Sequence, residues 1–138
     1  MNKKKIGKVI GWLLFVAWIG FIVKMTLIGR TLYPQRVFRP DLFYEFRELI
    51  TGAENGALNI KLFFENILLF IPFGMLLPWK KNWWTVLITG CVASALIEIT
   101  QYVTMLGELE FDDIIANTIG ALIGYFLFIA VKKIFYRR

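Results

Sequence analysis

The sequence predicts an all-α protein, an integral membrane bundle of four helices, because it is very hydrophobic and contains four long apolar stretches. Hydrophobic residues make up 58% of its 138 residues, more than in an ordinary soluble domain. The stretches lie at about residues 8–29, 59–79, 83–106 and 111–135. Each is long enough for the roughly 20-residue helix that crosses a bilayer. We therefore expect residues 1–138 to form a single transmembrane domain, with no room for a separate catalytic domain.

The first stretch is expected to remain in the protein as a helix. Its basic start and apolar run look like a secretory signal, but the run is longer than a signal core and no small-x-small cleavage motif ends it. The single cysteine, Cys91, excludes an internal disulfide.

The lysines and arginines orient the bundle. They gather at the start of the chain, at residues 80–81 and at the C-terminal end, and none of these regions contains an acidic residue. The positive-inside rule assigns all three regions to the cytoplasmic side, so both termini lie inside and the number of crossings is even. Every acidic residue then lies outside or in the outer half of a helix. These features predict a multi-pass protein of the cell membrane.

The net charge of +6 follows from the same basic regions. Lysines and arginines at helix ends attract anionic lipids, with roughly 1 kcal/mol for each residue near the surface. Membrane lipids are therefore expected partners, and nucleic acid is not.

The long connection at residues 30–58 is predicted to carry a short amphipathic helix on the outer leaflet. After Pro40, apolar residues recur at helical spacing, and Gly52 ends the segment. Glu45 falls among the charged residues of the opposite face. This helix would either only cover the bundle or act as a lid over a site within it. The apolar residues are Leu42, Phe46, Leu49 and Ile50.

Three carboxylates inside or at the mouths of the apolar stretches mark the candidate site: Glu65, Glu98 and Asp113. Ionisable groups at membrane depth are costly, and they usually face a bundle interior or a wet cavity. Each has an amide side chain nearby in the sequence, and all three would open toward the outer side. The predicted ligand-binding set is Glu65, Asn66, Glu98, Gln101, Tyr102, Asp112, Asp113 and Asn117.

Helix packing should bring this set together. Asp113, Asn117, Gly120 and Gly124 form one stripe of the last helix, and the Gly120-x-x-x-Gly124 spacing allows close approach of another helix. The same spacing could join two copies of the chain, so a homo-oligomer stays open. The polar groups could also merely satisfy one another and lock the bundle.

The residue types limit the chemistry. The chain has no histidine, which excludes a Ser-His protease, a histidine-nucleophile phosphatase and a histidine-ligated zinc site. No nucleotide-binding loop is present. Two carboxylates with an amide could hold a divalent cation in an enzyme, but we expect no metal and no cofactor.

A set of residues spread from Glu65 to Gly124 carries a family resemblance. It comprises Asn66, the run Leu-Phe-Ile-Pro-Phe-Gly at residues 69–74, Pro78, Glu98, Gln101, Asp113, Asn117, Gly120 and Gly124. In this order and spacing they resemble the VanZ-like family of small bacterial membrane proteins. Family members often carry Gly-Arg before the acidic cluster, whereas Gly107 is followed here by Glu108-Leu109-Glu110. If that arginine is a countercharge in relatives, Arg30 or Lys61 would replace it.

The resemblance implies resistance to teicoplanin and related lipoglycopeptide antibiotics, exerted at the cell envelope. We expect a non-catalytic protein that binds an amphiphile, either the drug or a lipid-linked cell-wall component, in an acidic outer cavity. Aromatic residues of the long connection would receive an acyl chain. Three alternatives stay open: a membrane enzyme on a lipid-linked envelope substrate, with Glu98 as base and Asp113 as acid; a proton-coupled exporter; and a structural partner of another membrane protein.

Overall fold

The computed structural model describes residues 3–136 and contains the four long helices that the sequence predicts. They are α1 (Lys3–Leu27), α3 (Gly56–Leu76), α4 (Trp83–Thr104) and α5 (Phe111–Tyr136). Each includes a segment long and apolar enough to cross a membrane. Their ends lie within a few residues of the expected ones, so the all-α membrane bundle is confirmed.

The long connection holds a short helix, α2 (Tyr44–Thr51), and is tied to the junction between α4 and α5. Strand β1 (Phe38–Arg39) pairs in parallel with strand β2 (Leu109–Glu110). In addition, the Tyr33 N–H donates to the Met105 carbonyl oxygen at 2.7 Å. These contacts fix the path of the connection, and the two strands are too short to change the fold class.

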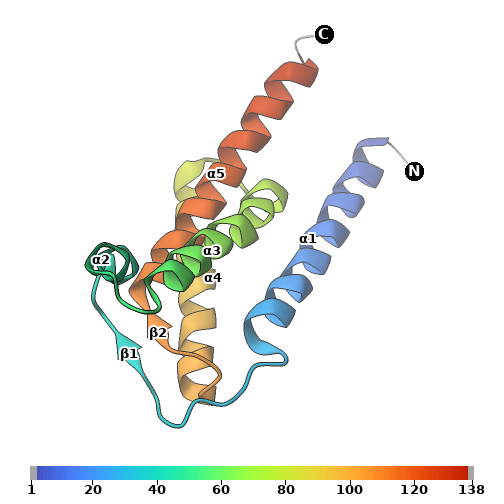
Figure 1. The fold of residues 1–138 in the computed structure, drawn as a ribbon. Helices are drawn as coiled ribbons and strands as arrows, with labels where there is room; N and C mark the ends of the chain where they lie inside the picture. The colour runs from blue at the N-terminus through green and yellow to red at the C-terminus, as the bar shows by residue number, and fades with distance from the viewer. Residues whose placement is uncertain (1–2, 137–138) are drawn as a thin grey trace.

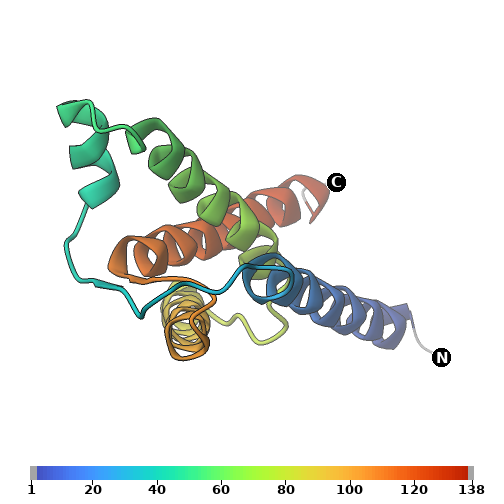
Figure 2. The ribbon, with the colours of Figure 1, turned by 60° about the horizontal axis from the view of Figure 1, so that its bottom comes forward.

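The chain termini and the acid-rich connections lie at opposite ends of the bundle. Figure 1 shows the N-terminal end of α1 and the C-terminal end of α5 at the same end of the molecule, and Figure 2 agrees. The connection at residues 28–43 and the α4–α5 junction lie at the opposite end. The arrangement has the even number of crossings that the basic clusters predict, with the acid-rich connections gathered away from the termini.

Glycines allow α3 and α5 to cross in close contact. A Cβ atom at Gly74 would overlap the carbonyl oxygen of Ala121, and one at Gly124 would overlap that of Ile71. A Cβ at Gly120 would overlap the carbonyl oxygen of Ile67 in the same way. The glycine stripe therefore packs within the chain, as predicted, and turns that face of α5 inward.

The apolar core is small, and much of the apolar surface faces outward. Phe15, Phe70, Phe73 and Leu77 are buried where α1 meets α3. Many large apolar side chains on the long helices are exposed instead. Lipid tails accept such side chains as readily as a protein core does. This surface therefore suits a protein that is surrounded by lipid.

Helix α2 exists where the sequence predicts it, but its inward face is the one that carries Glu45. Leu49 and Ile50 are exposed, whereas Tyr44 and Glu45 are buried. Phe46 packs against Phe63 of α3, with ring centroids 5.2 Å apart. An apolar face can turn toward lipid, so the polar face of α2 is free to cover the interior. The sequence pattern did not indicate that Glu45 turns into the protein.

Candidate functional site

A cavity of about 520 Å³ opens among the helices at the acid-rich end. It is lined from α1, α2, α3, α4 and α5 and by the two connections at this end. Among the lining residues that the structure describes, six carry carboxylates and only Arg30 carries a positive charge. The cavity lining is therefore rich in acidic groups. Its acidic residues are Glu45, Glu65, Glu98, Glu108, Glu110 and Asp113.

The structure brings most of the predicted site residues to this cavity. Tyr102 does not line it, and Asp112 lies buried beside it. Glu65 stands at its exposed rim, 3.5 Å from Lys61. The predicted residues that line the cavity are Glu65, Asn66, Glu98, Gln101, Asp113 and Asn117.

Asp112 positions α2. Its two carboxylate oxygens accept hydrogen bonds from the backbone N–H groups of Phe43, at 2.7 Å, and Tyr44, at 2.9 Å. Phe43 precedes the helix in a left-handed conformation and offers no side-chain cap of its own. The first N–H groups of a helix lack partners within it. Asp112 supplies that cap from α5 and draws α2 over the cavity.

The amide side chains join helices. Gln101 donates to the Thr26 carbonyl oxygen at 2.9 Å, which ties α4 to α1. Asn117 donates to the Ser94 hydroxyl at 2.8 Å, which ties α5 to α4. Asn66 of α3 interacts with Asp113. The carboxylate–amide pairs suggested by sequence proximity are therefore rearranged in space, and the amides hold the cavity walls together.

Glu98 lines the cavity from α4 and contacts the α4–α5 junction. It is buried, with 2% of its surface exposed. Its Oε2 accepts the backbone N–H of Glu110 at 3.1 Å, which fixes the α4–α5 junction over the cavity. Arg30 interacts electrostatically with both Glu98 and Asp113.

Arg30 rather than Lys61 is the cation that enters the cavity. The guanidinium of Arg30 lies against Gly107, where an added Cβ would come within 3.3 Å of Nη1. Lys61 instead stands at the exposed rim beside Glu65. This chain has no arginine just after Gly107. Arg30, which follows the end of α1, places its guanidinium beside that glycine instead.

Three lining carboxylates were not foreseen: Glu45, Glu108 and Glu110. Glu108 forms an ion pair with Arg39, which also lies over the Tyr44 ring at 4.8 Å from its centroid. All three lie outside the apolar stretches, where acidic residues are common and carry no signal of depth. Only the pairing of β1 with β2 and the cap at Asp112 reveal that they reach the cavity.

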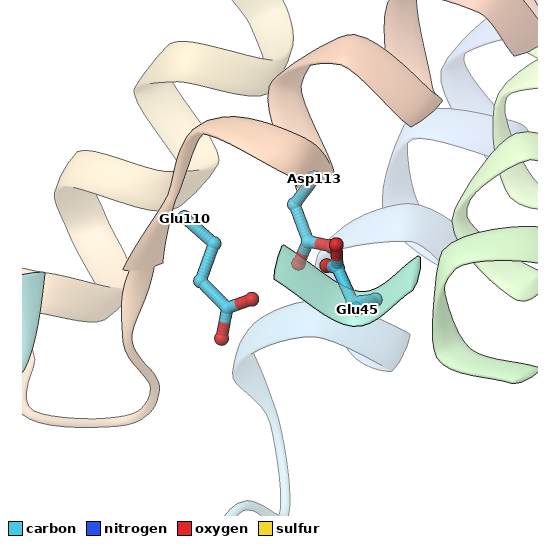
Figure 3. Close-up of side chains that lie close together, drawn as sticks. All are labelled: Glu45, Glu110 and Asp113. Carbon is cyan, nitrogen blue, oxygen red and sulfur yellow. The ribbon is translucent and has the colours of Figure 1, made fainter. Parts of the chain in front are cut away.

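Glu45 is buried and Glu110 is half-buried, and both carboxyl groups are harder to ionise than in water. Burial, and then a hydrogen bond with Asp112, raises the pKa of Glu45 to about 9. Burial, and then repulsion from Asp113, raises the pKa of Glu110 to about 8. Figure 3 shows both side chains reaching toward Asp113. At neutral pH this corner of the cavity therefore favours a proton or another cation.

Comparison with known proteins identifies the family. The model of the VanZ/LLP1 family matches residues 9–133, nearly the whole chain. The chain belongs to the VanZ/LLP1 family. It is also similar to Protein VanZ of Enterococcus faecium, with 32% identity over 108 residues that cover 75% of this chain and 67% of the relative. No solved structure matches. Family membership and the four candidate membrane spans make it a multi-pass protein of the cell membrane.

Proposed function

We propose that this VanZ/LLP1 family member protects the cell against teicoplanin-type lipoglycopeptides by binding the drug at the outer face of the membrane. The observation that carries the proposal is the concentration of acidic groups in the cavity lining, six carboxyl groups beside one guanidinium. Carboxylates that are shielded from water form strong hydrogen bonds with an amine. A cationic amphiphile is therefore a better occupant than the anionic phosphates of a lipid-linked cell-wall component.

The apolar wall of the cavity supports an acylated ligand. Trp18, Phe21 and Met25 of α1 and Leu68 of α3 line it. Phe21, Met25 and Leu68 are also exposed on the outer surface of their helices, where lipid would surround them. An acyl chain could thus lie along this wall while the polar head meets the carboxylates. The expected aromatic contribution comes from Tyr33 and Tyr44 of the connection, together with Trp18 and Phe21.

The proposal predicts protection that depends on the charge of Glu98. A sensitive Gram-positive host would carry the wild type, Glu98→Gln or Glu54→Gln, with membrane levels checked by blot. Glutamine keeps an oxygen that can accept the Glu110 N–H but loses the charge, and Glu54 is exposed and outside the cavity lining. We expect the wild type and Glu54→Gln to protect against teicoplanin, and Glu98→Gln to lose that protection.

Vancomycin is the matched second drug, because it lacks the acyl chain of teicoplanin. We expect little protection against it. No protection against teicoplanin by well-expressed wild type would overturn the proposal, and so would equal protection by Glu98→Gln. Loss of the Glu98→Gln protein from the membrane would instead assign Glu98 to locking the bundle.

A further inference from the structure

Three carboxylates of the cavity converge from segments that are far apart in the sequence. Glu45 comes from α2, Glu110 from β2 and Asp113 from the first turn of α5 (Figure 3). One oxygen atom of each lies within 4.8 Å of the corresponding atoms of the other two. Such proximity of like charges is unfavourable unless protons or a bound cation neutralise them.

The spacing of these oxygens fits one cation. Calcium binds oxygen ligands at about 2.3–2.6 Å, so two ligands on opposite sides of it stand up to about 5 Å apart. Magnesium binds at about 2.0–2.1 Å and limits that separation to about 4.2 Å. Oxygens that lie within 4.8 Å of one another can therefore all reach one calcium ion, whose coordination is the more flexible of the two.

An unpartnered buried atom points to the same conclusion. Only 2% of the Glu45 surface is exposed, and its Oε2 has no hydrogen-bond partner. Asn117, one turn beyond Asp113 on α5, is equally buried, and its Oδ1 also lacks a partner. Buried polar atoms without partners are rare in native proteins and each requires an explanation. Both atoms are oxygen acceptors, so each of them lacks a cation or a hydrogen-bond donor.

The positive side chains nearby supply only part of that charge, because Arg39 acts on Glu110 and Arg30 acts on Asp113. Arg39 is held by Glu108, in an ion pair with a second contact of 3.3 Å from Nη2 to Oε1. Arg30 divides its effect between Asp113 and Glu98. Asp112, whose oxygens face the start of α2, adds a further negative charge beside Glu45.

We propose that Glu45, Glu110 and Asp113 bind one divalent cation, with calcium as the best fit, and that this cation fastens α2 over the outer end of the cavity. Asp112 holds the first N–H groups of α2, and the cation would hold the next side chain, Glu45. The site does not depend on the proposed amphiphile, because Glu65 and Glu98 remain available to a cationic head group.

Calcium binding is measured on the full-length protein, purified in a nonionic detergent and stripped of metal with a chelator. Isothermal titration with calcium chloride is expected to give one saturable site per chain. Glu45→Gln and Glu110→Gln each replace a charged ligand with a neutral amide and should weaken binding at least tenfold, whereas Glu54→Gln should not change it. Hydrogen exchange in residues 44–51 should slow on calcium addition in the wild type and in Glu54→Gln. It should not slow in Glu45→Gln or Glu110→Gln.

Several results would overturn the site. One is the absence of saturable binding by folded wild type at about 10 mM calcium, well above the weakest dissociation constants of extracellular calcium modules. Another is a Glu45→Gln variant that binds calcium with the same affinity as the wild type. If that variant fails to fold, as judged by gel filtration, Glu110→Gln decides by the same criterion, because Glu110 is only half-buried. Tighter binding of magnesium than of calcium would contradict the fit. Since no drug is present, these outcomes are independent of protection against teicoplanin.

Discussion

Asp112 shows how one side chain can determine where a whole element lies. The carboxylate belongs to α5. It accepts hydrogen bonds from the N–H groups of Phe43 and Tyr44, which precede it in the chain by 69 and 68 positions. The neighbouring ion pair between Asp41 and Arg47 is 3.7 Å long and exposed on both sides. Exposed pairs of this kind contribute little, so the cap contributes more to holding α2 than this ion pair does.

Replacing the cap should release α2. In Asp112→Ala, one buried and one partly buried N–H group lose their acceptors, and we expect a loss of about 1–3 kcal/mol from the free energy that keeps α2 docked. Hydrogen exchange of residues 43–47, followed by mass spectrometry in detergent, should quicken. Asp41→Ala serves as the control and should leave that exchange unchanged. Equal exchange in wild type and Asp112→Ala would show that α2 is held by other contacts.

The sequence identified the site carboxylates that lie within apolar stretches, but it gave no signal for those in the polar connections. Glu98 and Asp113 stand out because a carboxylate within an apolar stretch is costly. Glu45 and Glu110 stand in polar connections, where the sequence assigns them no depth. The amides show a similar difference: Asn117 belongs to the cavity as predicted, but its hydrogen bond goes to Ser94, which no spacing rule indicates.

The crossing of α3 and α5 is the element-scale feature that positions the site. Because Gly74, Gly120 and Gly124 let the two backbones touch, the face of α5 that bears Asp113 and Asn117 is turned toward α3 and α4. The spacing of glycines predicted this packing. It did not predict which helix would pack against α5, because α3 and α4 each contain a glycine, Gly74 and Gly90.

Adding one methyl group at this crossing should be costly. In Gly124→Ala the new Cβ would overlap the Ile71 carbonyl oxygen, so the helices must separate. We expect the free energy of unfolding to fall by about 1–3 kcal/mol, as in other overpacked sites. Gly20→Ala is the control, because nothing lies within 4 Å of its added Cβ. It should be neutral or stabilise α1 by up to about 1 kcal/mol.

Thermal unfolding followed by size-exclusion chromatography in detergent compares the two variants. A lower melting temperature for Gly124→Ala than for Gly20→Ala is expected. If both variants melt with the wild type, the contact between α3 and α5 is looser than the structure indicates.

At the scale of the whole molecule, the separation of charge links the fold to the proposed function. Lysine and arginine clusters mark one end of the bundle, and the acidic cavity opens at the other. Hydropathy and charge are properties of single segments, so the sequence predicted the helices and their orientation. The closure of the cavity depends on contacts between α2 and α5 and between β1 and β2, which join distant segments and leave no periodic signal.

The account rests on the claim that the acidic cavity binds a cationic amphiphile. The most direct measurement is the binding of teicoplanin to the purified full-length protein in nonionic detergent, for the wild type, Glu98→Gln and Glu54→Gln. We predict saturable binding by the wild type and Glu54→Gln, about tenfold weaker binding by Glu98→Gln, a loss near 1.4 kcal/mol, and weaker binding of vancomycin. Absence of teicoplanin binding, or equal affinity in Glu98→Gln, would contradict the account.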